Sequence, residues 1–115
     1  MDEPTPQDLR ARYRPRLDAE LASLSAASAD TSGDRRPVEL NQSSVGRLSR
    51  MDAMQQQAMA TAQEARRTGR RSILEAALVR LEGEEFGFCE ACGDFIGWTR
   101  LDLDPTLRRC IGCAA

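Results

Sequence analysis

Residues 86–92 read Phe-Gly-Phe-Cys-Glu-Ala-Cys, and residues 110–113 read Cys-Ile-Gly-Cys. These two CxxC pairs contain all four cysteines of the 115-residue chain, which has no histidine. Two cysteines separated by two residues lie on one tight turn, so their sulfurs face the same side of the backbone. Two such turns provide the four thiolates that tetrahedral Zn²⁺ prefers, and the seventeen intervening residues suit a zinc site. The pattern predicts one zinc ion bound by Cys89, Cys92, Cys110 and Cys113.

Three other uses of these cysteines are weaker interpretations. Disulfides are disfavoured because the N-terminus has no signal-peptide pattern. A thioredoxin-like redox pair needs a βαβ pattern, which neither CxxC has. Iron also binds four thiolates and remains an alternative to zinc. With four protein ligands the metal has no open position, so we expect a structural ion that supplies the folding free energy of this short segment.

The first part of the chain predicts a helix from about residue 6 to residue 27. Thr5 is a helix-capping residue, and Pro6 suits the first helical position. An apolar stripe follows at intervals of four and three: Leu9, Tyr13, Leu17, Leu21 and Leu24. Pro15 interrupts this stretch, so we expect a distortion there or a helix start. Residues 28–43 are rich in turn-forming residues and predict an exposed polar loop.

A second, longer helix is predicted from about residue 44 to residue 82, capped by Ser43 or Ser44 and followed by Gly83. Its apolar stripe is read as Val45, Leu48, Met51, Met54, Ala58, Ala62, Ala65, Gly69, Ile73 and Ala76, continuing to Leu78 and Leu81. The methionines are interpreted as core residues rather than as a ligand surface. Small residues in the stripe let another helix approach closely.

These elements predict a mainly α fold. Residues 1–83 form a long antiparallel, coiled-coil-like helical hairpin, and residues 84–115 form a small four-cysteine zinc finger. Ile96, Trp98, Leu101 and Leu103 are expected to be the apolar cluster of the finger. Arg100, Arg108 and Arg109 either offset the charge of the zinc tetrathiolate or lie solvated on the surface.

Composition narrows the class of protein. The chain has 16 basic and 18 acidic residues, a net charge of −2, whereas a small nucleic-acid-binding protein is usually markedly basic. No apolar run is long enough to span a bilayer, so we expect a cytoplasmic protein without membrane contact. No nucleophile with a base and no phosphate-binding glycine loop is found, so no enzyme activity is expected.

The finger resembles the DksA/TraR zinc-finger family. The resemblance covers residues 84–113. The motifs that carry it are Phe86-Gly87-x-Cys89-x-x-Cys92-Gly93, Ile96-Gly97, Arg100-Leu101, Pro105-Thr106 and Cys110-Ile111-x-Cys113. It implies a bacterial transcription regulator that binds core RNA polymerase, as a monomer and without binding DNA. The family inserts its hairpin into the secondary channel of the polymerase, and acidic residues at the tip act near the catalytic centre. The alternative is a zinc-ribbon module that binds nucleic acid through its arginines, including Arg66-Arg67 and Arg70-Arg71.

The tip and the ppGpp site depart from the family pattern. The Asp-x-x-Asp-x-Ala motif of the tip is absent. Acids near the expected tip are Asp30, Asp34 and Glu39, and Asp52-Ala53 is a partial echo of the motif. The candidate polymerase contacts are therefore Asp34, Asp52 and Ala53. Asp104 stands where better-known members carry a basic residue implicated in ppGpp binding, so the resemblance does not support a ppGpp response.

Overall fold

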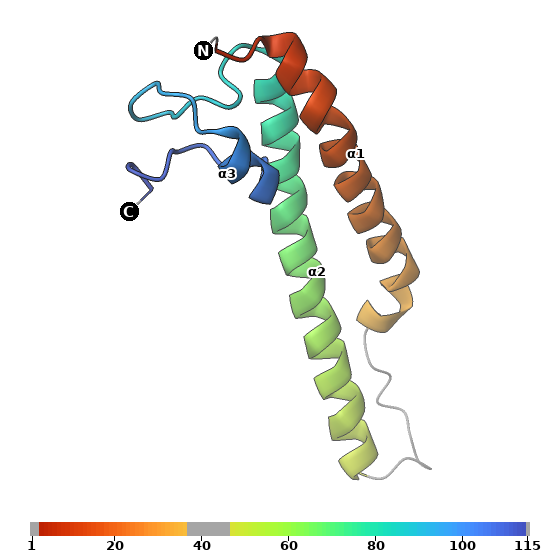
Figure 1. Cartoon of the computed structure of the whole chain (residues 1–115). Helices are drawn as coiled ribbons and strands as arrows, with labels where there is room; N and C mark the ends of the chain where they lie inside the picture. The colour runs from red at the N-terminus through yellow and green to blue at the C-terminus, as the bar shows by residue number, and fades with distance from the viewer. Residues whose placement is uncertain (1–2, 37–46, 115) are drawn as a thin grey trace. The chain divides into compact units, whose positions relative to one another are not determined.

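The computed structural model describes residues 3–36 and 47–114. These residues form α1 (Pro6–Asp30), the short 3-10 helix η1 (Ser32–Arg35), α2 (Arg47–Glu82) and α3 (Trp98–Leu103) (Figure 1). No strand occurs in the described ranges, where an isolated bridge joins Phe88 to Phe95. Within these ranges, no helix is both long and apolar enough to cross a membrane.

The chain divides into two compact units. Unit 1 comprises Met1–Leu21 and Arg71–Ala115, and unit 2 comprises Ala22–Arg70. In unit 1, Arg10 of α1 donates to the carbonyl of Leu81 near the end of α2 (2.9 Å). In unit 2, Ser28 near the end of α1 contacts Glu64 within α2. The two helices therefore run antiparallel, and the predicted mainly α fold with contacting long helices is confirmed.

The start of α1 is fixed by a reciprocal cap. The Asp8 backbone N–H donates to the Thr5 hydroxyl, and the Thr5 N–H donates to the Asp8 carboxylate, both at 3.1 Å. Each bond satisfies a donor that the first turn leaves without a helical partner. The helix continues through the exposed Pro15 and reaches Asp30, where the sequence predicted an end near Ala27. Helix α1 is thus not restarted at the proline.

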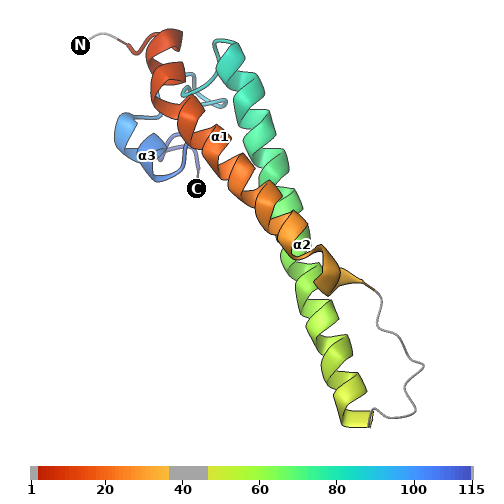
Figure 2. The same cartoon turned by 90° about the vertical axis from the view of Figure 1, so that its right-hand side faces the viewer.

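Unit 1 contains the apolar core. Leu9, Tyr13 and Leu17 of α1 are buried, as the α1 stripe predicted. Figure 2 shows this part of α1 alongside the last turns of α2. Further buried side chains come from α2 (Leu74, Ala77 and Leu81) and from the finger (Phe86, Ile96 and Leu101). The ring centres of Tyr13 in α1 and Phe86 in the finger lie 5.7 Å apart, so the hairpin base and the finger share one core. Burying each large side chain in it stabilises the fold by about 1.5–3 kcal/mol.

The apolar stripe predicted for α2 is wrong over most of its length. Met51 is 56% exposed, Met54 51% and Ile73 49%, so these methionines are not core residues. Near the end of α2, Leu81 is buried as predicted, but the other buried positions are Leu74 and Ala77, each one residue after a predicted position. Val45, with the expected caps Ser43 and Ser44, lies outside the described residues.

Polar residues on the inward face explain this error. In unit 2 the less exposed positions of α2 recur at threes and fours, and five of these seven side chains are polar. The positions are Arg50, Ala53, Gln57, Ala60, Glu64, Arg67 and Arg70. A search for hydrophobic periodicity passes over such a face and follows the exposed methionines and alanines instead.

The Glu64 carboxylate contacts residues of three helices in unit 2. Its Oε1 accepts hydrogen bonds from the Ser28 hydroxyl at 2.8 Å and from Arg67 Nη1 at 3.2 Å, and it lies 3.4 Å from Arg35 Nη1. The Ser28 hydrogen bond is the largest cause of a lowered pKa at Glu64. Arg35 belongs to η1, which forms within the predicted polar loop. One carboxylate therefore ties α1, η1 and α2 together.

Candidate functional site

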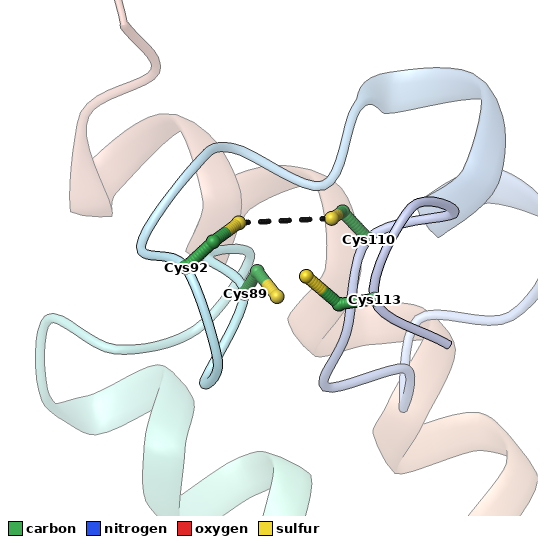
Figure 3. A group of neighbouring side chains, drawn as sticks. All are labelled: Cys89, Cys92, Cys110 and Cys113. Atoms are coloured by element: carbon green, nitrogen blue, oxygen red, sulfur yellow. Dashed lines mark hydrogen bonds between the residues drawn. The ribbon is translucent and has the colours of Figure 1, made fainter. Parts of the chain in front are cut away.

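The four predicted metal ligands converge in the finger. The sulfurs of Cys89, Cys92, Cys110 and Cys113 all lie within 4.8 Å of one another (Figure 3). The Cys92 and Cys110 sulfurs are 3.7 Å apart. A tetrahedron with Zn–S bonds of about 2.3 Å has edges of about 3.8 Å, whereas a disulfide would bring two sulfurs to about 2.05 Å. The spacing suits a shared tetrahedral metal and excludes a disulfide between these two cysteines.

Backbone hydrogen bonds shape the two turns that carry the cysteines. In the first, the Cys89 N–H donates to the Asp94 carbonyl and the Gly93 N–H donates to the Cys89 carbonyl, both at 2.8 Å. Gly93 has φ +82°, a conformation that L side chains rarely adopt. In the second turn, the Cys113 N–H donates to the Cys110 carbonyl at 3.0 Å. Each CxxC pair is thus a tight turn, as its spacing predicts.

Glu90 joins the two turns. Its backbone N–H donates to the Arg108 carbonyl at 2.8 Å. Its carboxylate accepts a hydrogen bond from Arg109 Nε at 3.1 Å and lies 3.9 Å from Arg108 Nε. Of the two sequence interpretations of these arginines, neither anticipated this carboxylate partner.

The electrostatics of the sulfur cluster favour a cation. Backbone hydrogen bonds, that of Cys110 first, lower the pKa of Cys89 to about 6, which favours its thiolate. Side-chain hydrogen bonds with Cys110, Cys89 and Cys92 raise the pKa of Cys113, because they stabilise its protonated thiol. All four groups can ionise together only when a cation offsets their charge. The donor set and its geometry therefore fit zinc.

Asp102 of α3 holds the finger against α1 within unit 1. Its carboxylate accepts two hydrogen bonds from Arg12, at 3.0 and 2.6 Å, and one from the Tyr13 hydroxyl at 2.8 Å. Its backbone carbonyl accepts a further bond from Arg16. The Arg12 guanidinium also lies 5.0 Å from the centre of the Trp98 ring. We call Arg12, Tyr13, Arg16, Trp98 and Asp102 the α3 clamp.

The clamp perturbs its ionisable groups. Hydrogen bonds from Arg12 and Tyr13 lower the pKa of Asp102 to about 2. Burial, and then the Asp102 contact, raise the pKa of Tyr13 to about 12. Asp102 could not be singled out from the sequence, because an exposed acid on a six-residue helix has no distinguishing pattern. The sequence also predicted Leu103 in the apolar cluster, but that side chain is 78% exposed, whereas Ile96 and Leu101 are buried.

The candidate tip residues lie in unit 2. Asp34 in η1 and Ala53 in α2 line one groove of about 420 Å³, together with Arg36 and Gln57. Asp52 is exposed and does not line that groove. The structure therefore brings together two of the three candidates. Asp30 is exposed at the end of α1, and Glu39 lies outside the described residues.

Comparison with known proteins identifies the finger. The family model described as the prokaryotic dksA/traR C4-type zinc finger matches residues 84–115. Over 40 residues, the chain is 45% identical to the RNA polymerase-binding transcription factor DksA of Haemophilus influenzae. It is 48% identical over 40 residues to the proteins of the same name from Escherichia coli K12 and Salmonella typhimurium.

The likeness is confined to part of each protein. The aligned residues cover 35% of this chain, 28% of the Haemophilus protein and 26% of the Escherichia protein. The chain thus spans little more than a quarter of the length of the curated relatives it matches. The family match and the four-cysteine cluster together indicate a structural zinc ion.

Proposed function

Because residues 84–115 form a C4 zinc finger of the DksA/TraR family, we propose that this chain is a bacterial transcription regulator that binds core RNA polymerase. The observation that carries the proposal is the match of the finger to proteins named as RNA polymerase-binding transcription factors. Such a regulator acts by binding rather than by catalysis, in the cytoplasm where transcription occurs.

All four cysteines coordinate the zinc in this proposal. Its role is structural, because four protein ligands leave no position for water or substrate. The core around the finger supports this role, since Phe86, Ile96 and Leu101 are buried in unit 1 with residues of α1 and α2. When bound, the ion links the two turns and thereby stabilises the finger against the base of the hairpin.

The hairpin formed by α1 and α2 is the part that enters the secondary channel. Asp34, Asp52 and Ala53 are the proposed contacts with the polymerase. Asp34 and Asp52 are exposed, which leaves their carboxylates accessible to a partner. The shared groove of Asp34 and Ala53 gives these two residues a common surface. The regulator is proposed to act as a monomer, without direct DNA binding.

A ppGpp response is not part of the proposal. Asp104 replaces the basic residue that the family resemblance associates with ppGpp. Its Oδ1 accepts hydrogen bonds from the Thr106 N–H at 3.0 Å and the Thr106 hydroxyl at 2.7 Å. A carboxylate held in this turn repels phosphate groups instead of binding them.

Nucleic-acid binding through the arginines is the second candidate. The observation in its favour is the convergence of Arg100, Arg108 and Arg109 on one groove of the finger. The net charge of −2 weighs against it.

The direct test is binding of the zinc-loaded protein to bacterial core RNA polymerase, measured by co-elution in gel filtration. The proposal expects a stoichiometric complex that a known secondary-channel factor displaces and that forms equally well without DNA. Absence of a complex, with zinc bound and helices intact, would overturn it. Binding to nucleic acid alone, with a steep salt dependence, would support the second candidate.

A further inference from the structure

An open groove on unit 1 gathers four arginines beside the second cysteine turn. Arg80 of α2, with Arg100, Arg108 and Arg109 of the finger, lines a cavity of about 500 Å³. Apolar and small side chains complete its wall: Ile73, Ala76, Leu107 and Ala114. We call this cavity the arginine groove. None of the residues that line it is a cysteine or belongs to the α3 clamp.

The groove contains more positive than negative charge. Glu90 is the one acidic residue among those lining it, against four arginines. Its carboxylate contacts Arg109 and Arg108. Arg80 and Arg100 instead donate to backbone carbonyls, those of Thr106 (3.2 Å) and Arg109 (3.1 Å). Within the described residues, no ion pair of the groove engages Arg80 or Arg100.

Arg80 has the electrostatic environment that bears most directly on a ligand. It is partly buried at the end of α2, and burial followed by repulsion from Arg108 lowers its pKa. Attraction from the Glu90 and Glu85 carboxylates opposes this shift without cancelling it. A partly buried guanidinium near a second one favours the approach of a further anion.

We propose that the arginine groove binds an acidic segment of a protein partner. Glu90 already demonstrates the contact, because a carboxylate sits on two of the guanidiniums. Guanidinium groups match the geometry of carboxylates well. The apolar wall formed by Ile73 and Leu107 suits a peptide that alternates acidic and apolar side chains. Single-stranded nucleic acid, by contrast, needs aromatic platforms for its bases, and no aromatic residue lines the groove.

This inference rests on the proposed function, in which the partner is core RNA polymerase. The groove then adds an anchor at the finger to the contacts made by the hairpin. Its carboxylate partner is an acidic segment on the polymerase surface, and Glu90 competes with that segment for Arg108 and Arg109.

The experiment measures the affinity of zinc-loaded protein for core RNA polymerase in four variants. Arg80→Gln and Arg108→Gln are expected to raise Kd about tenfold each, equivalent to about 1.4 kcal/mol. Arg14→Gln is the control, because it removes the same charge from an exposed ion pair with Glu82 outside the groove, and it should change Kd less than about twofold. Zinc content and Trp98 fluorescence verify that each variant is folded.

Glu90→Gln should change the affinity for core polymerase in the opposite direction. It frees Arg108 and Arg109 from the resident carboxylate, so binding should tighten about threefold, which corresponds to about 0.7 kcal/mol. Loss of folding cannot produce tighter binding, so this variant separates the inference from a stability effect. The affinity differences should also shrink as salt rises.

The outcomes are distinct. If the wild-type protein does not bind polymerase, the proposed function fails and the inference fails with it. If it binds, but the groove variants match Arg14→Gln, the inference alone is overturned. A fluorescent ten-nucleotide oligouridine tests the other source of anionic groups: binding that requires Arg80 and Arg108 would assign the groove to nucleic acid and overturn the protein partner.

Discussion

Two neighbouring residues of α2 test which face of this helix is buried. Leu74 is fully buried in unit 1, whereas Ile73 is 49% exposed. Leucine and isoleucine have isomeric side chains, so truncating each to alanine removes three carbon atoms. Removing a fully buried leucine side chain costs about 3 kcal/mol, through lost transfer free energy and the cavity that remains. Removing a half-exposed isoleucine costs less than about 1 kcal/mol, partly offset by the higher helix propensity of alanine.

The assay is urea unfolding of the zinc-loaded protein, followed by the fluorescence of its single tryptophan, Trp98, which lies in unit 1. For a protein of this size, an m-value of about 1.5 kcal/mol/M converts 3 kcal/mol into a midpoint lower by about 2 M for Leu74→Ala. Ile73→Ala should shift the midpoint by less than about 0.7 M. Equal shifts, or a larger shift for Ile73→Ala, would refute the burial of the Leu74 face and restore the stripe read from the sequence.

Three further predictions follow from unit 1. Tyr13 is the only tyrosine, and its pKa of about 12 should appear as a late phenolate transition in ultraviolet absorbance. The raised pKa of Tyr13 stabilises the fold fully below about pH 10, and this stabilisation is lost as pH rises towards 12. Asp102→Asn should lower the pKa of Tyr13. A titration midpoint near 10 in the wild-type protein would contradict the α3 clamp. Gly87→Ala should destabilise the fold by about 2 kcal/mol in denaturant titrations, because Gly87 has φ +87° and an added Cβ would lie 3.3 Å from Leu9. Gly33→Ala is the control, because Gly33 has open space around it. Equal destabilisation by the two variants would contradict the requirement for glycine at position 87. Cys113→Ser should release zinc, measured with a chromogenic chelator, and unfold the finger while much of the helical circular dichroism remains; unchanged zinc content would refute the ligand assignment.

The finger could be predicted from the sequence because its chemistry is local. Two CxxC pairs specify tight turns by themselves, and the structure brings their four sulfurs together. The Thr5 cap and the α1 stripe depend on neighbouring residues in the same way. Local patterns of this kind can be interpreted without knowing which distant segment packs against them.

The face of α2 could not be predicted from hydrophobic periodicity alone. Its inward positions in unit 2 include Gln57, Glu64 and Arg67, whose polar groups are satisfied by partners distant in sequence. Only the tertiary partner, here Ser28 for Glu64, explains why a carboxylate faces the other helix. The α3 clamp could not be predicted for the same reason, because Asp102 accepts its hydrogen bonds from Arg12, which lies about ninety residues away in the sequence.

We propose that the hairpin enters the secondary channel of RNA polymerase. A photo-crosslinking amino acid at Ala53, within the groove shared with Asp34, tests it most directly when the protein is bound to core polymerase. The account predicts cross-links to residues that line the secondary channel, and their loss when a known channel factor competes. Cross-links to the outer surface of the polymerase, or none while the complex persists, would contradict it.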